Sequence, residues 1–203
     1  MPSIFDTLTW LEKTNNPFGV RCLDCRLFAQ SMRSTVPNLN TVAQFNGLRS
    51  STGEQHTDQL PPNVVTVSCN LTYPYDGQSE EGPLFVAEVM EDKWDSYFYD
   101  NSLYFARSWT GSLVFRAKMR LTATEVTITT IDADAQISSP DMTHIVRQVD
   151  FLLKSHLYGW DIPHPLPVDL PPEVKPIALY SFGQYGRRAL FATYEDTLPI
   201  RLT

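Results

Sequence analysis

The chain has 203 residues, 42% of them hydrophobic, which is enough to bury one sizeable core. Its 23 acidic and 16 basic side chains give a net charge of −7, which argues against nucleic acid or anionic lipid as a partner. The first residues contain no basic segment and no long apolar stretch, so we expect no signal peptide, no membrane anchor and a cytoplasmic location.

The first fifty residues are predicted to be helical. Ser3 and Asp6 have the spacing of a capping box, and the apolar residues behind them predict a short helix that stops before Pro17. Asp24 is a favourable N-cap for a second helix, which runs on toward Pro37. These two helices would form most of the N-terminal part of the fold.

The middle of the chain is predicted to be a sheet. A weaker helix over 41–48 and a solvated polar loop over 50–62 come first. The hydrophobic period then changes to two, which is typical of strands. The predicted strands cover 65–69, 84–90, 94–99, 103–108, 113–119 and 125–131. Because the turns between them are too short for helical crossovers, the sheet should be antiparallel.

The last third has three predicted parts. Ser139, Pro140 and Asp141 provide a helix start, and the apolar face behind them predicts a helix that ends at Gly159. Six prolines in 161–176 predict an extended strap across the core, with an exposed ligand for another protein's groove as the alternative. The remaining 177–203 should form a terminal hairpin, with a helix as the alternative.

Together these elements predict a single α+β domain that comprises residues 1–203. Its parts would be a helical segment 1–50, a mainly antiparallel sheet of about six or more strands over 63–132, and a helix over about 140–157 packed on the sheet. The strap and the terminal hairpin would complete the domain.

Three cysteines are the only metal-like residues with suggestive spacing. Cys22 and Cys25 form a C-x-x-C pair, and Cys69 is a weak third candidate for zinc. Cys25 would lie in the first turn of a helix, where the helix dipole lowers a thiol pKa. The histidines that could complete a site are isolated, namely His56, His144, His156 and His164. We therefore favour plain buried thiols and expect no cofactor.

Charge is unevenly distributed along the predicted sheet. Eight acids and one base lie between Asp76 and Asp100, whereas four bases and no acid lie between Arg107 and Arg120. One interpretation is a solvent face held by cross-strand ion pairs. The other is a docking surface with aromatic anchors. The candidate binding residues are Trp94, Asp95, Tyr97, Tyr104, Arg107 and Trp109.

One segment resembles a known motif. The residues Tyr104, Phe105, Arg107, Ser108, Trp109, Thr110 and Gly111 are similar to a strand and turn found in small bacterial domains of unassigned function, sometimes beside ADP-ribosylglycohydrolase-like modules. The resemblance implies a bacterial α+β module and suggests a connection to nucleotides or ADP-ribose. The residues themselves indicate a turn at Gly111 and a core role for Trp109, with Arg107 stacked on it or paired with Asp95.

Two functional hypotheses remain open. The first is a non-enzymatic interaction or regulatory protein, of an immunity-like kind, whose partner is another protein, because no full set of catalytic residues accompanies the aromatic and acidic segments. The second is a domain that binds or hydrolyses a small, nucleotide-like molecule, with Arg107 as the anion contact and Asp95 or Glu88 as the base.

Overall fold

A computed structural model describes residues 3–35, 38–78, 80–136 and 141–201. The fold is α+β, as predicted, and the chain divides into two compact units. The first unit contains Met1–Thr35, Glu91–Lys93 and Asp150–Thr203, and the second contains Val36–Met90 and Trp94–Val149. The organisation as one domain stays a prediction. None of the described helices has the length and apolar character needed to cross a membrane.

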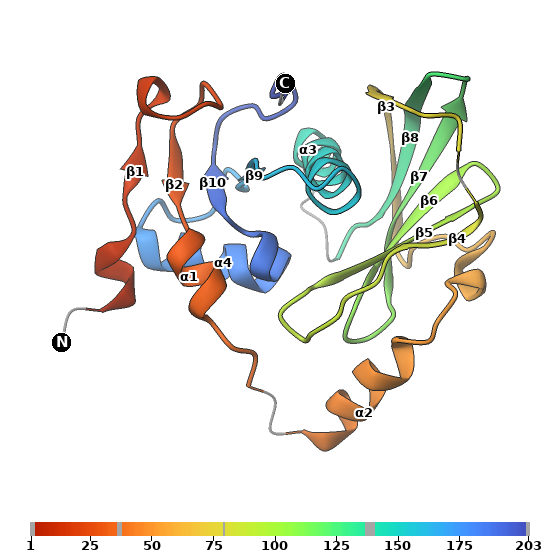
Figure 1. The fold of residues 1–203 in the computed structure, drawn as a ribbon, viewed down its shortest axis with the longest axis horizontal. Coiled ribbons are helices and arrows are strands. Elements are labelled where there is room, and N and C mark those ends of the chain that lie inside the picture. The colour runs from red at the N-terminus through yellow and green to blue at the C-terminus, as the bar shows by residue number, and fades with distance from the viewer. Residues whose placement is uncertain (1–2, 36–37, 79, 137–140, 202–203) are drawn as a thin grey trace. The chain divides into compact units, whose positions relative to one another are not determined.

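The second unit is built on a six-stranded antiparallel sheet (Figure 1). The strand order is β3-β8-β7-β6-β5-β4, so that β3 and β4 are the edge strands. The strands are β3 (Val64–Pro74), β4 (Gly82–Phe85), β5 (Trp94–Tyr99), β6 (Ser102–Arg107), β7 (Leu113–Leu121) and β8 (Glu125–Asp134). The predicted sequential strands and their antiparallel pairing are confirmed.

Local turn chemistry explains the β5–β6 hairpin. Asp100 and Asn101 have φ of 47° and 53°, the left-handed conformation that a tight two-residue hairpin turn requires. Gly111 has φ of 69° in the turn before β7. The predicted strand 84–90 is wrong beyond its first two residues, because β4 spans Gly82–Phe85. After the end of β4, the Ala87 N–H donates to the Asp95 carboxylate at 2.7 Å. This side chain takes the place of the backbone carbonyl that would accept the hydrogen bond in a continued strand.

The helices of the second unit differ in detail from expectation. Helix α2 (Leu39–Leu48) is confirmed, and the Asn38 side chain caps it. The predicted solvated loop 50–62 is wrong in part, since it contains the 3₁₀ turn η3 (Glu54–His56) with a buried His56. Helix α3 (Met142–Leu152) confirms the long helix; it begins in the second unit, whereas its end from Asp150 onward and the π-helical turn η4 (Leu153–Leu157) that continues it belong to the first unit. Its predicted start at 139–140 lies outside the described residues.

The first unit has a small mixed sheet. Its order is β1 (Trp10–Leu11), β2 (Cys22–Asp24), β10 (Phe191–Thr193) and β9 (Pro163–Pro165). The pairs β1–β2 and β2–β10 are antiparallel, and β10–β9 is parallel. Because side chains alternate along a strand, neighbouring residues of β2 and β10 point to opposite faces of this sheet.

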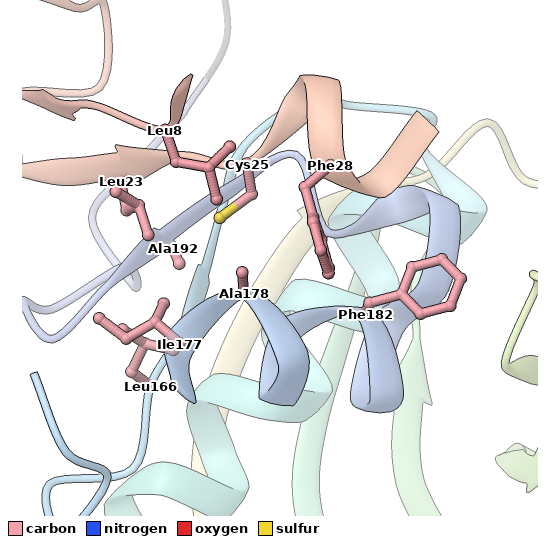
Figure 2. Close-up of a cluster of buried hydrophobic side chains, with 9 residues drawn as sticks. All are labelled: Leu8, Leu23, Cys25, Phe28, Leu166, Ile177, Ala178, Phe182 and Ala192. Carbon is pink, nitrogen blue, oxygen red and sulfur yellow. The ribbon is translucent and has the colours of Figure 1, made fainter. Parts of the chain in front are cut away.

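One face of the small sheet carries the main core of the first unit. Leu23 and Ala192 lie on this face and pack against α1 (Arg26–Ser31) and α4 (Val174–Tyr185). Figure 2 shows the nine side chains of the cluster, which are Leu8, Leu23, Cys25, Phe28, Leu166, Ile177, Ala178, Phe182 and Ala192. The other face carries a smaller cluster of Cys22, Leu190 and Phe191 with Leu11 and Phe18.

The N-terminal helices are shorter than predicted. The Ser3–Asp6 capping box is present, but it caps only the 3₁₀ turn η1 (Ile4–Thr7). The chain then becomes extended and pairs as β1 before a second 3₁₀ turn, η2 (Lys13–Asn15). Helix α1 has Cys25 rather than Asp24 as its N-cap residue. The Asp24 carboxylate nevertheless accepts a hydrogen bond from the Arg26 N–H at 3.1 Å. It therefore satisfies one of the backbone N–H groups in the first turn that have no partner within the helix.

The C-terminal hairpin is wrong, and the alternative helix is correct. Helix α4 occupies Val174–Tyr185 and is followed by the 3₁₀ turn η5 (Gly186–Arg188). Pro176 lies in the first turn of α4, where a missing N–H costs no intrahelical hydrogen bond. The predicted extended strap over 161–176 is therefore wrong at its end, where α4 begins at Val174. Within the same segment β9 is an edge strand, a position that proline tolerates.

Candidate functional site

Asp95 is the centre of a closed ion pair in the second unit. Its side chain is 1% exposed and accepts two hydrogen bonds from Arg49, at 3.0 and 2.9 Å. The Ala87 N–H donates a third. The Arg49 guanidinium also donates to the carbonyls of Phe45 and Ser108. A carboxylate with three donors inside a protein is suited to hold the chain together rather than to take a proton from a substrate.

Arg107 faces away from Asp95. In the β5–β6 register Arg107 lies opposite Trp94, while Asp95 lies opposite Ala106, so Arg107 and Asp95 project from opposite faces of the sheet. The Arg107 guanidinium carbon lies 4.7 Å from the Trp94 ring centroid. The predicted Arg107–Asp95 pair is therefore wrong. The predicted stacking occurs on Trp94 rather than on Trp109, whose indole N–H donates to the Met90 carbonyl at 2.7 Å.

The aromatic candidates are core residues. Trp94, Tyr97 and Tyr104 are each 1% exposed, which contradicts their predicted role as surface anchors. Arg107 and Trp109 are half-buried. Side chains this deep can meet a partner protein only after local rearrangement, so an interaction surface has to be sought elsewhere.

The buried side chains of Tyr97 and Tyr104 contact the segment around η3 and hold it against the sheet. Gly53, with φ of 81°, lies against the face of the Tyr97 ring, and the Tyr104 hydroxyl accepts the Asp58 N–H at 3.3 Å. The His56 ring lies 5.6 Å from the Tyr97 ring, centroid to centroid. Burial lowers the His56 pKa, and the charge of Asp95 opposes this shift. This arrangement explains why the predicted loop is ordered against the sheet.

The three cysteines do not form one site. Cys22 and Cys25 are fully buried in the first unit, and Cys69 lies on β3 of the second. Burial raises the thiol pKa to about 11 for Cys22, about 12 for Cys25 and about 11 for Cys69. The predicted lowering at Cys25 is wrong because desolvation exceeds the dipole of a six-residue helix. No group of three potential metal ligands occurs within the described ranges.

A pocket of about 370 Å³ lies on the face of the small sheet opposite the main core of the first unit. Phe18, Leu190 and Phe191 form its apolar surface, and the Phe18 and Phe191 ring centroids are 5.0 Å apart. Arg26 and Asp161 also line it. The volume falls within the range of about 300–1,000 Å³ that is usual for small-molecule sites, and the pocket is open to solvent.

The guanidinium at this pocket is already paired. Arg26 Nε and Nη2 donate to the Asp24 carboxylate at 3.0 and 2.7 Å, and this hydrogen bonding raises the Arg26 pKa. The same guanidinium lies 5.0 Å from the Phe191 ring centroid. Within the described part of the chain, Asp161 has no ion-pair partner. The pocket therefore combines an aromatic floor with a solvent-exposed carboxylate that forms no salt bridge within the described residues.

The edge strand β3 is a second surface with binding capacity. It contains eleven residues, and none of them is charged. Val64 is 44% exposed and Ser68 is exposed, which leaves the start of the strand open to solvent. A register shift follows Ser68, so the strand has one regular stretch at Val64–Ser68 and a second at Leu71–Pro74. The opposite edge, β4, has only four residues and contains Pro83.

A buried polar cluster around η4 was not predicted from the sequence. Lys154 is fully buried, and its Nζ donates to Asp150 at 2.7 Å and to the Thr197 carbonyl at 3.3 Å. Ser155 Oγ and His156 Nδ1 are hydrogen-bonded at 2.7 Å. The Asp150–Lys154 spacing of four residues on a predicted helix was the available signal, but this spacing is usually read as an exposed pair.

Comparisons of the chain with protein-family models, curated proteins and solved structures found no match.

Proposed function

We propose that the protein is a non-enzymatic interaction or regulatory protein, of an immunity-like kind, that receives an extended segment of a protein partner at β3. The observation that carries the proposal is an edge strand of eleven residues without a charged side chain. The N–H and C=O groups that point outward from an edge segment such as Val64–Ser68 can serve as a template for another strand. The aromatic residues first considered as anchors have a supporting role, since they order the sheet that presents this edge.

The contrast between the two edges of the sheet supports the proposal. Proteins usually protect edges by shortening the strand, by proline or by lysine. β4 has the first two features, with four residues and Pro83, whereas Val64–Ser68 of β3 has none of the three. The β-branched residues Val64, Val65, Thr66 and Val67 also favour strand pairing.

The partner segment would pair through its backbone and pack apolar or β-branched side chains beside those of β3. The net charge of −7 favours a basic partner, because complementary charge speeds encounter. The proposal includes a cytoplasmic, bacterial setting, and the free state of all three cysteines is compatible with a reducing compartment.

The test compares two charge additions in the same unit. Ser68→Lys places an ammonium on the open edge, and Ala43→Lys adds the same charge to an exposed position of α2. Proteins retained by the unmodified chain from cells of its source would be identified by mass spectrometry and produced in pure form. Their affinity for each variant would then be measured, together with amide hydrogen exchange of the complex.

We expect Ser68→Lys to weaken binding by at least about tenfold and Ala43→Lys to leave it unchanged. Exchange of those amides in Val64–Ser68 that point away from β8 should slow in the complex, because they gain strand partners. Equal affinity for both variants, or unchanged exchange along β3, would refute strand addition at this edge. Failure to retain any partner reproducibly would count against the interaction role itself.

A further inference from the structure

We infer that the pocket of the first unit binds a planar aromatic ligand that carries amine or amidine N–H groups, the class to which aminopurines and aminopyrimidines belong. The inference is independent of the strand addition proposed for β3, because every residue that lines the pocket belongs to the other unit.

The floor of the pocket selects an aromatic ring. Phe18 and Phe191 are inclined at 58° with centroids 5.0 Å apart, and Leu190 extends the apolar surface. A planar ring packs well on such a surface because offset and edge-to-face contacts add to the area that it buries. Alternation along β10 fixes the floor, since Phe191 points to this face while Ala192 enters the main core.

The charge balance selects N–H donors. Arg26 is one cation, and it is matched by Asp24 through bonds of 3.0 and 2.7 Å. Asp161 adds a second carboxylate, for which the described residues provide no salt bridge. The charged residues that line the pocket are Arg26 and Asp161, both exposed to solvent. Because Asp24 neutralises Arg26 from outside the pocket, the carboxylate of Asp161 gives the site a net negative charge, which favours a donor or a cation over a phosphate or carboxylate ligand. An amidine can donate two parallel N–H groups to one carboxylate, as a guanidinium does.

Arg26 also restricts where the ligand can lie. Its guanidinium is 5.0 Å from the Phe191 ring centroid, so one face of that ring already has a cation beside it. A second cation placed there would be repelled, whereas a ring placed against Phe18 with its N–H groups toward Asp161 would not. The affinity for the ligand should therefore depend on both Phe18 and Asp161.

Three small probes separate the contributions of the ring and the charge. Benzamidine has the ring and the amidine, benzoate has the ring with the opposite charge, and acetamidine has the amidine without the ring. Binding would be followed by amide chemical shifts of the isotopically labelled full chain, up to about 10 mM probe, a range suited to weak fragments. Asp161→Asn and Phe18→Leu change the site, and Asp169→Asn is the matched control at an exposed aspartate of the same unit.

Benzamidine should give saturable shifts at the pocket, which Asp161→Asn and Phe18→Leu weaken by at least about tenfold and Asp169→Asn leaves unchanged. Benzoate and acetamidine should not saturate. The inference is overturned if benzoate binds as well as benzamidine, if acetamidine binds as well, if Asp161→Asn has no effect, or if no probe binds. Thermal unfolding of each variant would show that the fold is retained.

Discussion

His156 makes the first unit sensitive to acid. The side chain is 7% exposed, shares a 2.7 Å hydrogen bond with Ser155 and lies edge-on to the Phe151 ring. Burial, together with the nearby charge of Arg188, lowers the pKa of His156 from 6.5 to about 3, and the charge of Asp92 partly opposes this shift. The imidazole is therefore neutral in the folded protein at any pH above this value.

The stability change follows from the two pKa values. In the unfolded chain His156 titrates near its ordinary pKa of 6.5, whereas in the folded chain it titrates near 3. Protonation thus favours the unfolded state between these values, and the stabilisation present above pH 6.5 is lost progressively as the pH falls toward 3. Between about pH 7.5 and about pH 5 the loss amounts to about 2 kcal/mol, because each pKa unit corresponds to about 1.4 kcal/mol.

Urea unfolding of the unmodified protein and of His156→Gln at both pH values tests this directly. Carboxylates elsewhere titrate in both proteins, so the difference between the two free energies of unfolding isolates His156. We expect the free energy of unfolding of the unmodified protein, relative to that of His156→Gln, to be lower by about 2 kcal/mol at about pH 5 than at about pH 7.5. Gln30→Ala, at an exposed position of α1, should show a pH-independent difference. If the two proteins differ in free energy of unfolding by the same amount at both pH values, burial does not lower the pKa of His156 as inferred.

Three further predictions concern the residues around the candidate sites. Asp95→Asn should lower the free energy of unfolding of the second unit by about 3 kcal/mol in chemical denaturation, because the largely buried Arg49 loses its counter-charge. Gly53→Ala should lower the thermal midpoint and cost more than about 1 kcal/mol, since φ is 81° and a methyl group would meet the Tyr97 ring. Cys25 should resist a thiol reagent at about pH 8 until the protein is unfolded, because its thiol is buried and its pKa is about 12; rapid modification of the native protein would contradict this.

The sheet of the second unit was predictable because its signals are local. Residues 115–121 of β7 alternate between apolar and polar side chains, β8 alternates in part, and the Asp100–Asn101 pair fixes the hairpin between β5 and β6. Consecutive antiparallel strands need only neighbouring segments and short turns. The faces were harder to assign, because both faces of β5 and β6 are largely buried. Aromatic residues expected at the surface therefore became core residues.

The first unit was less predictable because its pairings are distant. β2 pairs with β10 across most of the chain, and these strands have three residues each. Strands this short carry little periodic signal. The segment that begins at Ile177 fits both a strand and a helix pattern, and its burial against α1 and the small sheet favours the helix. Tertiary contacts thus override a local ambiguity that sequence alone leaves open.

The pocket illustrates the same limit on site prediction. Phe18, Arg26, Asp161 and Phe191 come from four segments, and none of these segments carries a recognisable ligand motif. They meet because β2 and β10 pair and direct alternate residues to the two faces of one sheet. The packing that buries Leu23 and Ala192 therefore also positions the pocket floor. A ligand that binds only this folded arrangement must stabilise the first unit as its concentration rises above its dissociation constant.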